Sequence, residues 1–454
     1  MTEQTIMPLR RQCLLIILAL HACIFFSTVG AAKLTAWSAI VAGLVALCAL
    51  YALLKYHYKD LSFVDTRSKI LMGLLLLMSL VAVFSWWWHG AEGNIRKELF
   101  YALTISIFFV VYAYRPPLIW LWLGIGAVAI AAGVLAINSV YIQGGLRAGY
   151  SFLNPIPFGN LSLLAGLLCV PAMFLARTLR KGGGALIVFL LLGLFSGVFS
   201  SVLSGSRGGW VAIPFILLLF GYVYYHFFSK KIWLILTLVL SGVITFVWTS
   251  EELKFSQRVI EARDQIIAYH AGDVRSSQGG RLEMWRGALL LIQDKPLLGH
   301  GGVVAYRHAL FELIKDEKIN SVALVAYEYL SMEQEKLEEL IKTAESSVMF
   351  EHLHNDYLDR AVKQGLVGLV ALLLFYLVPI VLFSRYIRSK APTKQALAVS
   401  IVTLIVCYAI FGLTETFLIH TLCILPLGIL LMVFSAYFLI DDKAPLIADK
   451  SAQS

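Results

Sequence analysis

Long apolar windows separated by short polar stretches recur along most of this 454-residue chain. A helix that rises 1.5 Å per residue needs about 20 apolar residues to cross the roughly 30 Å hydrocarbon core of a bilayer. Windows of this length predict about twelve membrane-spanning helices. The predicted spans are 12–29, 36–54, 70–88, 99–114, 117–138, 158–178, 184–203, 210–228, 232–249, 365–384, 396–413 and 417–440. The pattern therefore predicts an all-α polytopic membrane protein.

One polar stretch is much longer than the others. Residues 250–361, between the ninth and tenth predicted spans, are rich in helix-forming residues, and 333–342 is the clearest amphipathic helix among them. The pattern divides the chain into nine spans in 1–249, this helical loop in 250–361, and three spans with a tail in 362–454.

Composition and charge support the membrane assignment. The chain is 59% hydrophobic and 14% charged, against about 25% charged residues in soluble proteins. With a cytoplasmic N-terminus, the cytoplasmic loops and termini hold 18 Lys and Arg with 6 acidic residues, and the other side holds 19 with 22. The positive-inside rule then places both termini in the cytoplasm and the long loop outside. The net charge of +9 is thus a topology signal, and nucleic-acid binding is not expected.

Two alternative interpretations concern the N-terminus and the cysteines. Segment 12–29 could be a signal peptide, because Val29–Ala32 loosely resembles a small-residue cleavage site. Its removal would leave eleven spans, whereas the alternation of loop charge fits twelve. All six cysteines lie within or at the edge of predicted spans, so neither disulfides nor cysteine-ligated metals are expected.

Polar side chains gather at the outer ends of the spans. Ser204–Trp210 places Arg207 among small residues just before a helix begins. A guanidinium beside exposed backbone N–H groups suits phosphate; the alternative is an interfacial arginine that extends toward water. Arg147, in the loop 139–157, is a further cation on the same side.

The long loop contributes three more candidates. Arg281 and Trp285 are four residues apart, so on a helix they share one face. Arg281 would provide a cation that binds phosphate, and Trp285 an indole that packs on a sugar or lies at the membrane interface. His300 lies between two glycines and is interpreted either as a turn residue or as a substrate contact.

The end of the long loop brings four polar residues together in sequence, namely His352, His354, Asn355 and Asp356. The two imidazoles would lie on the same side of an extended segment but about 200° apart on a helix. Glu415, between the last two spans, could bind an acceptor, hold an arginine or simply lie at the interface.

The order of these motifs along the chain resembles one known family. The motifs are Ser-x-x-Arg-Gly at 204–208, Arg-x-x-x-Trp at 281–285, Pro-Leu-Leu-Gly-His-Gly at 296–301, His-x-His-Asn-x-x-Leu at 352–358 and Gly-Leu-Val-Gly at 365–368. This order, over about residues 190–440, resembles the O-antigen ligase and polymerase superfamily of bacterial envelope glycosyltransferases. The long outer loop and the single His-Asn pair are most similar to O-antigen ligase.

The resemblance implies a GT-C-like helical fold in the inner membrane of a Gram-negative bacterium, with the active site facing the periplasm. It also implies a reaction, in which a finished O-antigen polysaccharide moves from undecaprenyl diphosphate to a sugar hydroxyl of lipid A–core. The expected partners are these two glycolipids and the membrane lipids. The sequence leaves the oligomeric state open and is compatible with a monomer.

This reaction needs two kinds of group. The enzyme must stabilise charge on the departing diphosphate and remove a proton from the incoming hydroxyl. We expect Arg207 and Arg281 to hold the diphosphate, with Arg147 as a third cation. Direct displacement would invert the anomeric carbon.

A histidine is the expected general base, because imidazole is the side chain that exchanges protons near neutral pH. The family pattern matches the histidine directly before asparagine, which favours His354, and His352 is the competing base. Asn355 or Asp356 would orient the ring.

No cofactor is expected. The first outer loop, Gly30–Lys33, lacks the paired acidic residues of metal-dependent membrane glycosyltransferases, and the arginines can neutralise the diphosphate. The sequence also lacks a phosphate-binding Gly-x-x-x-x-Gly-Lys loop.

Two other functions remain open. A polymerase, or a related transferase that loads glycans onto protein or another polymer, would use the same chemistry on a different acceptor. A transporter of lipid-linked glycans is disfavoured, because few charged residues lie in mid-span and the chain has no repeated halves.

Overall fold

The computed structural model describes residues 63–91, 95–149, 154–231, 255–272, 276–319 and 352–451, with a few single positions between 238 and 249. Regular structure in these residues is helical, and they contain no strand. Nine of the described helices are long and apolar enough to cross a membrane. The protein is therefore an all-α polytopic membrane protein, as the sequence pattern predicts.

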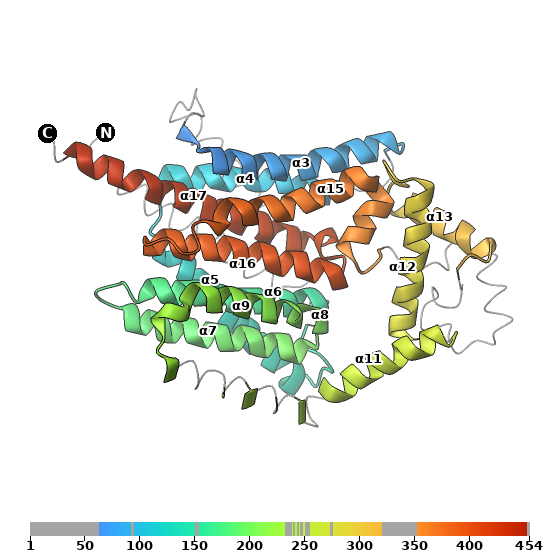
Figure 1. The fold of residues 1–454 in the computed structure, drawn as a ribbon, viewed down its shortest axis with the longest axis horizontal. Coiled ribbons are helices and arrows are strands. Elements are labelled where there is room, and N and C mark those ends of the chain that lie inside the picture. Colours follow the sequence, from blue (N-terminus) through green and yellow to red (C-terminus); the bar gives the residue numbers. More distant parts are fainter. Residues whose placement is uncertain are drawn as a thin grey trace. The chain divides into compact units, whose positions relative to one another are not determined.

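The nine helices confirm nine of the predicted spans (Figure 1). Three predicted segments, 12–29, 36–54 and 333–342, lie outside the described residues, as does most of 232–249. The observed spans are α3 (Thr66–Trp88), α4 (Arg96–Tyr114), α5 (Ile119–Ile137) with the π-helix η3 (Asn138–Ile142), α6 (Pro155–Ala176), α7 (Gly183–Ser204), α8 (Arg207–Trp210) with α9 (Ala212–Tyr224) and the 3₁₀-helix η4 (Tyr225–Phe227), α15 (Asp356–Ser384), α16 (Pro392–Thr414) and α17 (Thr421–Ser451).

The described residues form two compact units. The first comprises 63–83, 95–149, 154–216 and 370–451. The second comprises 84–91, 217–231, 255–272, 276–319 and 352–369.

The first unit is a bundle of apolar helices that run side by side in Figure 1. Its centre is formed by α6, α16 and α17, whose apolar windows are 78%, 83% and 94% buried, against 33% for α7. The outer side of α7 exposes Leu192 and Phe195, as a lipid-facing helix does. Close contact of α6 with α7 depends on Gly166 and Gly197, because a Cβ on either would press on the opposite backbone.

One end of this bundle is held by charged residues. Arg67 at the start of α3 pairs with Asp65 at 2.6 Å and with Asp442 of α17, and Lys394 of α16 also pairs with Asp442. The Arg67 guanidinium additionally lies 5.1 Å from the centre of the Tyr386 ring. Helix α3 is thereby joined at one end to α16 and α17, which follow it by more than 300 positions.

The second unit contains α11 (Phe255–His270), α12 (Ser277–Asp294), α13 (Val303–Lys315) and the first part of α15. These helices confirm that the long polar loop is largely helical in its described part. The loop has its own apolar core, because α12 and α13 each bury residues three and four positions apart. The core residues are Met284, Ala288, Leu291, Tyr306, Leu310, Phe311, Ile314, Ile319, Leu353 and Val362.

Candidate functional site

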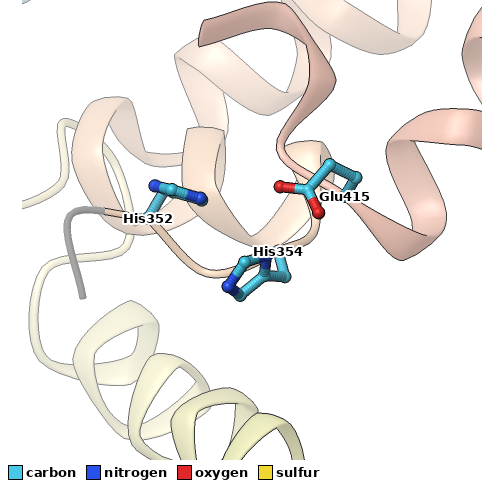
Figure 2. A group of neighbouring side chains, drawn as sticks. All are labelled: His352, His354 and Glu415. Carbon is cyan, nitrogen blue, oxygen red and sulfur yellow. The ribbon is translucent and has the colours of Figure 1, made fainter. Parts of the chain in front are cut away.

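The histidine segment is the non-helical lead-in to α15. Residues 352–355 have no helical assignment, and His354 has a φ of +50°, in the left-handed region. The rings of His352 and His354 lie 4.7 Å apart between centroids, at 64° to one another (Figure 2). Both side chains are half-buried. Of the two conformations that the sequence allows, the structure therefore adopts the one that brings both imidazoles together.

Leu353, between the two histidines, anchors this segment. Its side chain is fully buried in the core of the second unit. Its N–H donates to Asp359 Oδ1 at 3.2 Å, and its carbonyl oxygen accepts the indole N–H of Trp285 at 2.8 Å. The N–H of Trp285, which the sequence assigns to a sugar or an interface, thus contacts the backbone of the histidine segment.

Asn355 begins α15. Its Oδ1 accepts the N–H groups of Tyr357 and Leu358, each at 3.0 Å, which is the geometry of a helix N-cap. Asp356, in the first turn of the helix, is buried. A carboxylate there interacts favourably with the positive end of the helix dipole. A role for either residue in orienting the ring of His354 stays a prediction.

Helix α15 is interrupted at Gly365, whose φ of 66° and ψ of −163° are not helical. In a continuous helix the N–H of Leu366 would donate to the carbonyl of Val362, four residues earlier. Instead, the N–H of His300 donates to Val362 at 2.8 Å, and the N–H of Leu366 donates to the carbonyl of Pro296, also at 2.8 Å. The loop 296–301 is thus inserted into the break and satisfies the groups that the break exposes.

The same exchange occurs one residue later. The N–H of Gly301 donates to the carbonyl of Lys363 at 3.0 Å, and the N–H of Val367 donates to the carbonyl of Leu297 at 3.4 Å. Glycine is required at the crossing, because a Cβ on Gly299 would lie 2.5 Å from the Val362 carbonyl oxygen. The Pro-Leu-Leu-Gly-His-Gly motif is therefore a structural clamp on α15.

Two histidines support this clamp from outside. Nε2 of His300 lies 3.0 Å from the Leu291 carbonyl oxygen, and burial lowers the pKa of His300. Nε2 of His89 lies 3.1 Å from the carbonyl oxygen of Gly299. The backbone and ring contacts of His300 are those of a turn residue. His89 was not among the predicted residues, because it lies more than 200 positions from its partner at Gly299.

Arg281 lies in the first turns of α12, one turn before Trp285, so the two residues share a helix face as predicted. The helix begins at Ser276, whose Oγ accepts the N–H of Gly279 at 2.9 Å. The Arg281 side chain is half-buried and forms no hydrogen bond or ion pair within the described part of the chain. Its guanidinium is therefore available to an anion.

The first unit contains the second group of candidates, around the turn between α7 and α8. Arg207 is exposed at the first position of α8. The hydroxyl of Ser206 donates to Asn160 Oδ1 of α6 at 2.8 Å. A Cβ on Gly208 would overlap Thr414 Oγ1 at the end of α16, so the turn packs tightly against both helices. Asn160 is fully buried, and only the folded bundle reveals its contact with this turn.

Arg147 and Glu415 lie at the same end of the bundle. Nε of Arg147 donates to the carbonyl oxygen of Ser204, the last residue of α7, at 2.6 Å. Glu415 is buried and directly follows Thr414, the last residue of α16. The ends of α7 and α16 and the start of α8 are close in Figure 1. The first unit thus brings Arg147, Arg207 and Glu415 to one end of its helices.

These features define a class of protein. It is a multi-pass α-helical membrane protein. At one end of the helices of its first unit lie two arginines and a carboxylate. In its second unit two neighbouring imidazoles lie beside a helix that carries an arginine.

Comparison with known proteins finds a family match over part of the chain. Residues 191–373 match the family described as O-antigen ligase, in agreement with the resemblance that the order of the motifs indicates. The matched segment includes Arg207, Arg281, Trp285, His300 and the histidine segment. Arg147 and Glu415 lie outside it.

A relative is an uncharacterized protein of Haemophilus influenzae (strain ATCC 51907 / DSM 11121 / KW20 / Rd). It is 28% identical to this chain over 236 residues, which cover 51% of this chain and 52% of the relative. The alignment thus spans about half the length of either protein.

Proposed function

We propose that this chain is an O-antigen ligase. It transfers O-antigen polysaccharide from undecaprenyl diphosphate to a sugar hydroxyl of lipid A–core, on the periplasmic face of a Gram-negative inner membrane. Both termini are cytoplasmic in this proposal, which follows the loop charges. The helical fold would then be of the GT-C type.

The proposal rests on one observation above all. The part of the chain that matches the O-antigen ligase family holds two imidazoles in contact at the polar start of a membrane-spanning helix. A half-exposed imidazole at the membrane boundary is suited to take a proton from a sugar hydroxyl near neutral pH.

In the proposed reaction His354 accepts the proton of the acceptor hydroxyl. The hydroxyl oxygen attacks the anomeric carbon of the donor, and the bond from that carbon to the diphosphate oxygen breaks. The electron pair of this bond leaves with undecaprenyl diphosphate, whose charge Arg207 and Arg281 stabilise, with Arg147 as a third cation. A single displacement of this kind inverts the anomeric configuration.

The other candidates have supporting roles in this proposal. Trp285 and His352 flank the sugar next to the reacting hydroxyl, and Asn355 and Asp356 hold the start of α15. Glu415 is a further candidate for acceptor contact, whereas His300, whose ring lies against the Leu291 carbonyl, supports the loop 296–301. No metal is required, because the arginines supply the positive charge.

The direct test uses purified protein in detergent with undecaprenyl-diphosphate-linked O-antigen and lipid A–core. The native chain, His354→Ala and the control His308→Ala are compared on a gel that resolves lipopolysaccharide. His308 is exposed on α13. We expect glycan on lipid A–core with the native chain and the control, and none with His354→Ala.

Three results would contradict the proposal. Glycan that lengthens on the undecaprenyl carrier without lipid A–core would identify a polymerase. Retention of the anomeric configuration in the product would exclude a mechanism with a single displacement. Loss of transfer in EDTA that magnesium or manganese restores would show a metal requirement.

A further inference from the structure

We propose that Asp359 and Trp285 are positioning residues that set the orientation of both imidazoles by fixing the two peptide groups of Leu353. The catalytic consequence of this inference rests on the proposed function, whereas its structural part does not. Neither residue needs to touch the reacting atoms to act in this way.

The two hydrogen bonds to Leu353 act on different peptide groups. The N–H of Leu353 belongs to the peptide group that joins it to His352, and this N–H donates to Asp359 Oδ1 at 3.2 Å. The carbonyl of Leu353 belongs to the peptide group that joins it to His354, and this carbonyl accepts the Trp285 indole N–H at 2.8 Å. Because peptide groups are planar, fixing both planes fixes φ and ψ of Leu353 and the exit directions of both histidines.

The carboxylate that holds the first peptide group is itself fixed. Lys363, one turn later on α15, places its Nζ 2.8 Å from Asp359 Oδ1 and 3.0 Å from Oδ2. The side chains of Lys363 and Asp359 are only 13% and 6% exposed. The Lys363 ammonium also lies 5.3 Å from the centre of the Tyr306 ring. A buried carboxylate with these partners is a rigid acceptor.

The backbone next to this anchor is strained. A left-handed φ is sterically unfavourable in a residue other than glycine, and His354 has a φ of +50°. Such a conformation persists only where its surroundings impose it. The hydrogen bonds to Leu353 hold the peptide group before His354, and the helix start at Asn355 holds the chain after it, so together they impose this conformation. Released from them, the segment would relax and the imidazoles would separate.

The nitrogen of a general base must lie within about 3 Å of the hydroxyl oxygen whose proton it takes, so a shift of about 1 Å lowers the rate by up to about 100-fold. Donor and acceptor binding depend much less on this geometry. Loss of the anchor should therefore lower kcat more than it changes KM. Trp285→Phe removes the indole N–H but keeps an aromatic ring beside the proposed sugar, so KM for either substrate should stay within about threefold.

The experiment measures two quantities on the same preparations of the full-length protein. Hydrogen exchange followed by mass spectrometry reports protection of the peptide 352–358, and the transfer assay reports kcat and KM. The variants are Asp359→Leu, Trp285→Phe and Asp359→Asn. Asp359→Asn preserves an oxygen acceptor for the Leu353 N–H and removes the charge that pairs with Lys363.

We expect Asp359→Leu and Trp285→Phe to accelerate exchange in 352–358 about tenfold or more, and to lower kcat about 10- to 100-fold. Asp359→Asn should keep protection within about threefold of the native chain and recover most of kcat. If Asp359→Leu does not fold, the other two variants still test the proposal. Trp285→Phe is expected to accelerate exchange and lower kcat, whereas Asp359→Asn is expected to stay near the native values.

The outcomes separate the two proposals. Faster exchange with unchanged kcat, or native protection in both disruptive variants, would overturn the positioning role. A uniform loss of kcat in all three variants that follows their melting temperatures would also overturn it, because a merely structural role predicts that result. If the native chain transfers no glycan while exchange responds as expected, the anchor holds and the proposed function fails.

Discussion

The amide nitrogen of His300 lies 2.8 Å from the carbonyl oxygen of Val362, in the position that the amide of Leu366 would take in a continuous helix. This hydrogen bond is one of four that replace the internal bonds of α15 at its break. It joins the loop 296–301 to α15, the helix that follows the histidine segment, so a change at the break should also affect the histidines.

Gly365→Ala should destabilise the second unit. Gly365 has a φ of +66°, and an added Cβ would overlap the Leu297 carbonyl. Backbone strain and the lost hydrogen bonds together should cost about 2–4 kcal/mol. Thermal unfolding in detergent and hydrogen exchange of 296–301 would show it. Gly73→Ala, in open space on α3, is the matched control and should be neutral or slightly stabilising. Equal melting temperatures for the two variants would contradict the stabilising role of the contact between the loop 296–301 and the break in α15.

The stability of the same clamp should depend on pH through His300. Burial lowers the pKa of His300 below its ordinary value of 6.5, and nearby Lys295 and His89 act in the same direction, while the Leu291 carbonyl and Asp294 oppose them. The unfolded chain then binds the proton more readily than the folded one. The stability that this histidine contributes is therefore complete above pH 6.5 and is lost as the pH falls from there toward the lowered pKa.

We expect the melting temperature of the native chain to fall between pH 7.5 and pH 5.5 by more than that of His300→Gln, which cannot gain a proton. His308→Gln, an exposed control on α13, should retain the native pH dependence. If His300→Gln keeps the pH dependence of the native chain, the loss of stability at low pH comes from other groups.

Arg281→Ala should lower glycan transfer about 100-fold or more, because it removes a guanidinium from the departing diphosphate. Arg263→Ala is the matched control. Its side chain is 70% exposed on α11 and pairs only with Asp264 among the described residues, so transfer should stay within about twofold. Arg281→Lys should recover only part of the activity, since an ammonium lacks the paired N–H geometry. Steady-state assays with both glycolipids would measure these rates, and native activity in Arg281→Ala would exclude the proposed role.

Asp442→Asn should weaken the first unit, because it removes the carboxylate shared by Arg67 and Lys394. The Asp442 side chain is 25% exposed, so we expect about 1–3 kcal/mol rather than the larger cost of a fully buried pair. Thermal unfolding in detergent measures the change. The neighbour Asp441 forms no ion pair in the described residues and provides the control, Asp441→Asn. A larger effect of the control than of Asp442→Asn would reject the network.

Local geometry at the candidate site could be predicted only in part. The spacing of Arg281 and Trp285 places them on one helix face, as the structure confirms. The cap that Asn355 provides to α15 was not predicted. Asp359, His89 and Asn160 could not be found, because each acts on a segment that is close only after folding. The partner of Trp285 was missed for the same reason, since Leu353 lies 68 positions away.

The sequence by itself determined the nine membrane-spanning helices of the described residues and the match of residues 191–373 to the O-antigen ligase family. A span is specified by about 20 consecutive apolar residues, and the motifs by residues close together in the chain, so both are local properties. Only the tertiary structure decided that the two imidazoles meet, that Trp285 and Asp359 hold the peptide groups between them, and that the loop 296–301 replaces a turn of α15. These features depend on hydrogen bonds between segments far apart in sequence, and no local pattern encodes which buried N–H finds which carbonyl.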